Sequence, residues 1–157
     1  MQSKTRFICP LVTVRDVDAS RKFYENALDQ KVTDDFGENV VFEGGFSIHQ
    51  RDHYAKLIGN RRIAPGGNCY ELYLENDNLD EILKRLEEAE VTFIHKIVTH
   101  PWQQRAVRFY DPDMNIIEVG ESMETVCIRL ESEGKSPREI VELTSLGMEF
   151  VDRVLDR

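Results

Sequence analysis

The sequence has little cysteine and no long hydrophobic stretch. Its three cysteines, Cys9, Cys69 and Cys127, are widely spaced and form no CxxC pair. Such a set supports neither a disulfide framework nor a zinc knuckle, and it fits a reducing compartment. No apolar run approaches the ~20 residues that cross a bilayer, and residues 1–6 lead into a strand-like stretch without a secretory signal. We therefore expect a cytoplasmic protein with no membrane partner.

An excess of basic residues is also missing. Lysine and arginine total 20 against 29 aspartates and glutamates, which gives a formal net charge of −9. Most of such a surface repels a phosphate backbone, so we expect no nucleic acid as the main partner. The 157 residues, of which 41% are hydrophobic, suit one globular domain, with or without an appendage.

The hydrophobic pattern predicts the order strand, helix, strands, and then predicts it again. In the first half the predicted elements are strand 7–14, a helix opened by Asp16, Asp18 or Ser20, strands 39–43 and 46–51 around Gly44-Gly45, and a connecting loop over 52–67 with a helical turn. The buried stripe of the helix is expected to be Phe23, Ala27 and Leu28. In the second half they are strand 70–75, a helix opened by Asp77 or Asn78, and strands 91–98, 106–110 and 116–119.

A constant offset aligns the two halves and indicates a tandem duplication. The offset places Val12 on Leu74, Val17 on Leu79, Asp18 on Asp80, Ala27 on Ala89 and Cys9 on Glu71. The sequence therefore predicts an α+β fold of two tandem βαβββ modules, at about 5–60 and 68–121.

Residues 122–157 predict a C-terminal helical extension. Ser122 can cap a helix over 123–132, and residues 136–139 (SPRE) form a capping box with proline at the first helical position. The apolar residues that follow indicate two short helices. The last of these is acidic, which disfavours DNA reading, so we expect the extension to dock on the domain or on a second chain.

Three sequence motifs resemble one known superfamily. Residues 111–118 (DPDMNIIE) resemble the DPdGn-x-x-E signature of glyoxalase I, bleomycin-resistance and extradiol-dioxygenase proteins. Residues 14–24 resemble the opening v-x-D-l-x-x-S-x-x-FY of that family, and residues 102–105 (WQQR) its WGqR segment. The chain thus resembles the vicinal-oxygen-chelate superfamily over about residues 7–121, within a domain that we expect to span residues 5–121. The resemblance implies a curved sheet around one cavity that takes a small-molecule ligand, and a homodimer.

The resemblance also implies a divalent metal site. In metal-dependent relatives the ligands come from four equivalent strand positions, which fall here on Cys9, His49, Glu71 and Glu118. These donors suit zinc, nickel, iron, cobalt or manganese. In such a metal-dependent lyase the metal polarises a carbonyl of the substrate, and the carboxylate of Glu118 moves a proton.

The sequence departs from the family pattern, because the usual histidines of the first strand and of the second module are replaced by Cys9 and Glu71. The alternative is therefore a metal-free protein that binds or sequesters a ligand, as resistance proteins do. The carboxylates would then line a pocket or bind an arginine, because two inward carboxylates need a cation between them. The expected pocket residues are Tyr73, Trp102, Arg105 and Arg108.

Two expectations concern residues outside this set. His53, His95 and His100 are not paired at ligand spacing in the sequence, so we expect surface or structural roles for them. Met114 replaces the glycine that is usual in the DPdGn turn, so we expect Asn115 to take the positive φ angle there.

Overall fold

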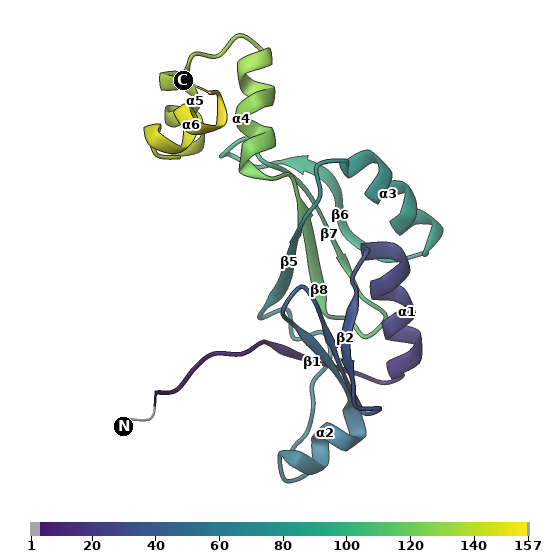
Figure 1. Ribbon diagram of the computed structural model, residues 1–157. Coiled ribbons are helices and arrows are strands. Elements are labelled where there is room, and N and C mark those ends of the chain that lie inside the picture. Colours follow the sequence, from purple (N-terminus) through teal and green to yellow (C-terminus); the bar gives the residue numbers. More distant parts are fainter. Residues whose placement is uncertain (1–3, 157) are drawn as a thin grey trace. The chain divides into compact units, whose positions relative to one another are not determined.

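The computed structural model describes residues 4–156 and divides the chain into two compact units (Figure 1). Unit 1 comprises the chain up to Tyr70 together with Tyr110–Asn115, and unit 2 comprises Glu71–Phe109 together with the chain from Ile116 onward. Each unit holds one four-stranded sheet, in the orders β1-β4-β3-β2 and β5-β8-β7-β6. In both, the first strand pairs in parallel with the last. The two tandem modules and the α+β class are thereby confirmed.

Unit 1 builds its core between one face of its sheet and helix α1. Its elements are β1 (Leu11–Val14), α1 (Val17–Leu28), β2 (Val32–Asp35), β3 (Asn39–Phe42), β4 (Ser47–Gln50) and α2 (Arg51–Leu57). Asp16 caps α1 by accepting from the Ala19 amide. The alternate residues Val12, Val40 and Ile48 are buried, whereas Leu11, Asn39 and His49 alternate with them and belong to the other face.

Several boundaries in unit 1 differ from the prediction. Strand β1 begins only at Leu11, and Phe7 and Ile8 before it are exposed. Tyr24, not Phe23, is the fully buried aromatic residue of α1, because its hydroxyl finds a buried acceptor in Asp111. Strand β2 was not predicted, since its residues are mostly exposed and polar. Part of the expected loop is the helix α2, which Gln50 caps.

Unit 2 repeats the arrangement of unit 1 and adds three helices. Its elements are β5 (Glu71–Glu75), α3 (Leu79–Glu88), β6 (Thr92–Thr99), β7 (Arg105–Tyr110), β8 (Ile116–Gly120), α4 (Met123–Ser132), α5 (Pro137–Thr144) and α6 (Met148–Val154). Asn78 is the residue that caps α3. Leu79, Ile82 and Leu86 of this helix are buried together with alternate residues of β5, β7 and β8.

The C-terminal helices bury their apolar stripes against one another. Ser122 caps α4, and the capping box at Ser136 opens α5 as the sequence predicts. The buried cluster consists of Val126, Cys127, Leu130, Ile140 and Val151, one or more from each helix. This extension therefore has a small core of its own within unit 2.

The turn between β7 and β8 corrects the expectation about its positive φ angle. Met114 has φ 68° and Asn115 does not lie in this region. The side chain of Asn115 is used instead to donate to Asp111 Oδ2, at 2.8 Å, and its amide donates to Asp111 Oδ1. These bonds hold Asn115 in place, so that the left-handed conformation falls on Met114, whose side chain is partly exposed.

Candidate functional site

Arg108 stands at the centre of the polar face of the unit 2 sheet. Its Nε donates to Glu71 Oε2 at 2.9 Å, and its Nη2 donates both to Glu71 Oε1, at 3.3 Å, and to Glu118 Oε2. Glu71 and Glu118 lie on the neighbouring parallel strands β5 and β8, where Glu118 pairs with Tyr73. One guanidinium thus serves both carboxyl groups that the sequence predicts as metal ligands.

Two histidines complete the ring of acceptors around Arg108. Its Nη1 lies 3.1 Å from His100 Nε2 and 3.4 Å from His95 Nε2. His95 Nδ1 faces the Lys96 carbonyl oxygen at 2.8 Å, so Nδ1 carries the proton and Nε2 is the acceptor. Burial and the charge of Arg108 lower the pKa of His100, which keeps this ring neutral. The expectation of surface or structural roles for His95 and His100 did not include this meeting, which arises because β6 and β7 are neighbours in the sheet and bring both histidines to Arg108.

The two carboxyl groups share a hydrogen bond and divide their protons unequally. Burial and the hydrogen bond to Glu71 raise the pKa of Glu118 to about 7. The bond from Arg108 lowers the pKa of Glu71, against a smaller opposing effect of burial. Near neutral pH the cluster therefore tends toward one ionised carboxylate, one protonated carboxyl and one guanidinium.

We expect Glu118→Gln to stabilise the protein at pH 8 by about 1–2 kcal/mol and to leave it unchanged near pH 4.5. The raised pKa means that ionising Glu118 costs free energy in the folded state. This cost is absent below the ordinary pKa of 4.5, grows as the pH rises, and is complete above about 7. Glutamine imitates the protonated carboxyl. Urea unfolding of both proteins at the two pH values measures the difference, and an equal difference at both would contradict the expectation.

Trp102 and Tyr73 join this cluster through Gln104. Trp102 Nε1 donates to Gln104 Oε1 at 2.9 Å, and Gln104 Nε2 donates to the Tyr73 hydroxyl at 2.8 Å. The Trp102 ring also stacks on His100, with ring centroids 4.4 Å apart. Trp102 is 42% exposed, so it is not the buried anchor that a lone tryptophan usually forms. Gly120 permits the close approach, because a Cβ there would lie 2.9 Å from Gln104 Nε2.

Arg105 has a different partner from Arg108. It donates from Nε to Glu121 Oε1 at 2.6 Å and from its amide to Glu121 Oε2 at 3.0 Å. Arg129 of α4 also donates to Glu121, whose side chain is fully buried. Sequence reasoning missed Glu121 and Gln104. The sequence did contain a signal that Arg105 and Arg108 have different surroundings. Arg105 alternates in phase with the buried Val107 and Phe109, whereas Arg108 belongs to the other face of β7.

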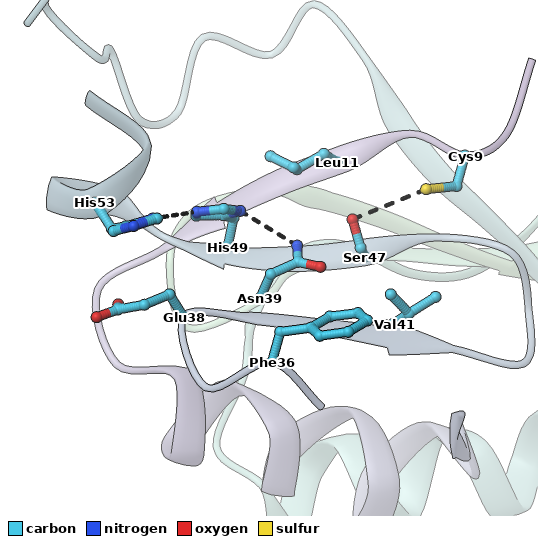
Figure 2. Close-up of a pocket in the computed structure, with 9 residues that line it drawn as sticks. All are labelled: Cys9, Leu11, Phe36, Glu38, Asn39, Val41, Ser47, His49 and His53. Atoms are coloured by element: carbon cyan, nitrogen blue, oxygen red, sulfur yellow. Dashed lines mark hydrogen bonds between the residues drawn. The ribbon is translucent and has the colours of Figure 1, made fainter. Parts of the chain in front are cut away.

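Unit 1 has a pocket on the face of its sheet away from the buried alternate residues, with a volume of about 520 Å³. Figure 2 shows His53, His49 and Asn39 in a line at one end, and Ser47 with Cys9 at the other. The lining residues are Cys9, Leu11, Phe36, Glu38, Asn39, Val41, Ser47, His49 and His53. The volume lies within the range of small-molecule sites.

His49 and Cys9 are both bonded within this pocket. His49 Nε2 lies 2.7 Å from His53 Nδ1, and His49 Nδ1 lies 3.2 Å from Asn39 Nδ2. The Cys9 thiol donates weakly to Ser47 Oγ at 3.9 Å. His53 was expected to have a surface or structural role, and its bond to His49 was not foreseen: α2 begins directly after β4 and turns His53 back onto His49.

The arrangement within the units does not fit a metal ion. Across residues 4–156, no group of three or more histidine, cysteine, aspartate or glutamate side chains is placed to hold one. Glu71 and Glu118 are neutralised by Arg108, and both ring nitrogens of His49 have protein partners. The four predicted ligands divide between unit 1, with Cys9 and His49, and unit 2. The four-residue metal site stays a prediction.

Comparison with known proteins supports the family assignment. The family model of the glyoxalase-like domain matches residues 7–124, which is most of the chain. The chain belongs to the glyoxalase-like family. A search of curated protein sequences finds no match.

Solved structures agree with the glyoxalase-like assignment. A protein of unknown function from Agrobacterium tumefaciens is 36% identical, with a TM-score of 0.69, over 77% of this chain and 97% of that one. A glyoxalase/bleomycin resistance protein/dioxygenase from Nocardioides is 19% identical, with a TM-score of 0.60, over 76% and 85%. A lactoylglutathione lyase from Agrobacterium tumefaciens is 22% identical, with a TM-score of 0.58, over 76% and 96%. At these identities, the last two structures support only the fold of this glyoxalase-like protein.

One further observation bears on the predicted partners. Among the helices of residues 4–156, none combines the length and the apolar composition that a membrane span requires.

Proposed function

We propose that this glyoxalase-like protein binds a small molecule without a metal ion. The observation that carries the proposal is the position of Arg108 between Glu71 and Glu118. Glu118 is buried and Glu71 is partly exposed, and two carboxyl groups on adjacent strands need a nearby cation. The guanidinium of Arg108 supplies that charge. A metal ion would have to displace an arginine that already has four protein acceptors.

Thermal melts of the parent protein with added zinc, nickel or manganese test this proposal. A ligand that binds the folded state at 100 times its Kd stabilises it by about 2.7 kcal/mol, which is roughly 5–10 °C in Tm for a chain of this size. We expect no shift with any of the three metals. A rise of several degrees with one of them would overturn the proposal and favour the metal-dependent alternative.

A second candidate is a lyase that acts on a carbonyl compound. The hydrogen bond between Glu71 and Glu118 favours it, because a protonated carboxyl beside an ionised one can give a proton to a ligand and take one from it. Glu118 is then the residue that moves the proton. Exchange of hydroxyacetone C–H protons in D2O, followed by NMR, separates this enzyme from a plain binder: the lyase requires exchange that Glu118→Gln abolishes.

The family resemblance extends the proposal to the assembly and location of the protein. We propose a homodimer in the cytoplasm. Acidity disfavours nucleic acid as a partner, and the scattered cysteines suit a reducing compartment. Sedimentation of the purified chain tests the dimer.

A further inference from the structure

The side-chain amide of Asn39 has a defined orientation in the unit 1 pocket. Its Nδ2 donates to the Ile48 carbonyl oxygen at 3.0 Å. A carbonyl oxygen can only accept, so the atom facing it must be the amide nitrogen. The same Nδ2 lies 3.2 Å from His49 Nδ1. Asn39 therefore presents an N–H group, and not its oxygen, to the imidazole of His49.

This orientation determines where His49 carries its proton. Nδ1 accepts from Asn39, so the neutral ring is protonated at Nε2. That Nε2–H group lies 2.7 Å from His53 Nδ1, in rings that are nearly parallel, at 16°. His53 Nδ1 consequently accepts, and the neutral ring of His53 carries its proton on Nε2. Every bond from Asn39 to His53 runs in one direction.

A metal ion at this position would need the opposite arrangement. A ligating histidine uses the lone pair of one nitrogen and donates from the other to an acceptor such as a carboxylate or carbonyl. In His49, by contrast, Nδ1 accepts from the N–H group of Asn39, and Nε2 donates its proton to His53. Burial and the nearby His53 lower the pKa of His49, against a smaller opposing effect of Glu38, which agrees with a neutral ring.

We propose that Asn39 fixes His49 in the Nε2–H tautomer, so that the chain Asn39–His49–His53 ends in a donor and the unit 1 pocket binds an uncharged carbonyl compound. His53 lines the pocket, and its Nε2–H is the donor left for a ligand oxygen. Leu11, Phe36 and Val41 provide an apolar wall for the rest of the molecule (Figure 2). Glu38 in the lining and the net charge of −9 disfavour an anion. This inference rests on the proposed metal-free function and names its ligand class.

The first test reads the tautomers in the parent protein. Long-range 1H–15N spectra of the full chain at pH 8 distinguish Nδ1–H from Nε2–H rings, and single His→Gln variants at 53, 95 and 100 assign the four signals. We expect the Nε2–H form for His49 and His53. An Nδ1–H form at His49 overturns the proposal. That result would not affect the proposed metal-free function, which rests on Arg108. A metal-induced rise in the Tm of the parent would instead overturn the metal-free function and would not affect the assigned tautomer of His49.

The second test reverses the hydrogen bond with Asn39→Asp. A carboxylate can only accept, so His49 should shift to the Nδ1–H form and free its Nε2 lone pair. We expect the affinity for cobalt(II), read from its visible absorption, to rise roughly ten- to hundredfold above that of the parent. Asn26→Asp, on the exposed side of α1, is the matched control for the added charge. An Asn39→Asp variant that binds cobalt no better than this control contradicts the role of Asn39.

The third test addresses the ligand class with three probes of similar size. Acetophenone carries a carbonyl, ethylbenzene lacks an acceptor and benzoate is an anion. We expect acetophenone to shift the His53 ring signals of the parent protein at lower concentration than the other two. Equal shifts from acetophenone and ethylbenzene, no shift from acetophenone, or a preference for benzoate would each reject the ligand class.

Discussion

Replacing Arg108 by alanine is expected to destabilise the protein by about 2–3 kcal/mol above pH 7 and to create a divalent-metal site. Breaking a buried ion pair costs about 3–5 kcal/mol because a charge is left uncompensated. We expect a smaller loss than this for Arg108→Ala, because Arg108 and Glu71 are 23% and 35% exposed and water screens part of their charge. Glu118 takes up its proton as the pH falls through about 7, and Glu71, whose pKa is lowered, does so only below its ordinary pKa of 4.5, so the loss should shrink as the pH falls.

The metal site follows from what surrounds the guanidinium. Glu71, Glu118, His95 and His100 all direct acceptor atoms at Arg108. Two carboxylates and two imidazoles form a donor set that suits zinc or cobalt. With the guanidinium removed, a metal ion can satisfy the same acceptors. We expect zinc to bind the variant at least tenfold more tightly than the parent, or about 1.4 kcal/mol, and to restore part of its lost stability.

Arg108→Lys is the matched control for this prediction. Lysine keeps a positive charge near the carboxylates but cannot bond all four acceptors from one planar group. It should lose less stability than alanine above pH 7 and gain no metal affinity. Calorimetric titration of zinc into the parent protein and the two variants measures the zinc affinity of each. If Arg108→Ala binds zinc no better than the parent, the view that Arg108 occupies the place of a cation is wrong.

Asp111→Ala is expected to cost about 3–5 kcal/mol of unfolding free energy. Asp111 is 3% exposed and accepts four hydrogen bonds in unit 1. The donors are the Tyr24 hydroxyl at 2.7 Å, the amides of Asp113 and Asn115 at 2.9 and 2.8 Å, and the Asn115 side chain at 2.8 Å. Alanine leaves these buried donors without an acceptor, and each unsatisfied group costs about 1–3 kcal/mol before relaxation.

Tyr24→Phe isolates one of these four bonds. It removes the hydroxyl and keeps the ring, which packs against Phe42 and Phe46. The expected loss is about 1 kcal/mol, the usual value of a single hydrogen bond. Urea unfolding followed by circular dichroism measures both variants. A loss for Asp111→Ala as small as that for Tyr24→Phe would show that the turn does not depend on the carboxylate.

The motif that carries the family resemblance thus has a structural role in this chain. Residues 111–115 were recognised by their similarity to the DPdGn signature, and the structure gives the physical content of that signature. Asp111 binds the turn and α1 through Tyr24, while Asp113, also buried, accepts from Arg15, Ser20 and Arg51. The tyrosine of the opening motif, Tyr24, matches the family pattern for the same reason, because its hydroxyl donates to Asp111. Pattern similarity could not say which residues touch, because it contains no distances.

The sequence by itself determined the order of elements and the repeat. Alternation of apolar residues gives the phase of a strand, and caps such as Asn78 and Ser136 give helix starts, because both depend on near neighbours in the chain. Elements with little burial escaped this reasoning. Strand β2 is mostly exposed and its sequence carries no strand pattern, so its extended conformation depends on its pairing with β3.

Only the tertiary structure decided which polar groups meet. Alternation places Glu71, Arg108 and Glu118 on a polar face, but their contact depends on the pairing of β5 with β8 and on the position of β7 beside it. His49 and His53 looked unrelated because one belongs to a strand and the other to a helix. Hydrogen bonds and ion pairs act over about 3–4 Å, so residues distant in sequence interact only where strand register brings them within that range. For this reason the family resemblance could suggest four metal ligands, while the sequence could not show that Arg108 and Asn39 contact three of them.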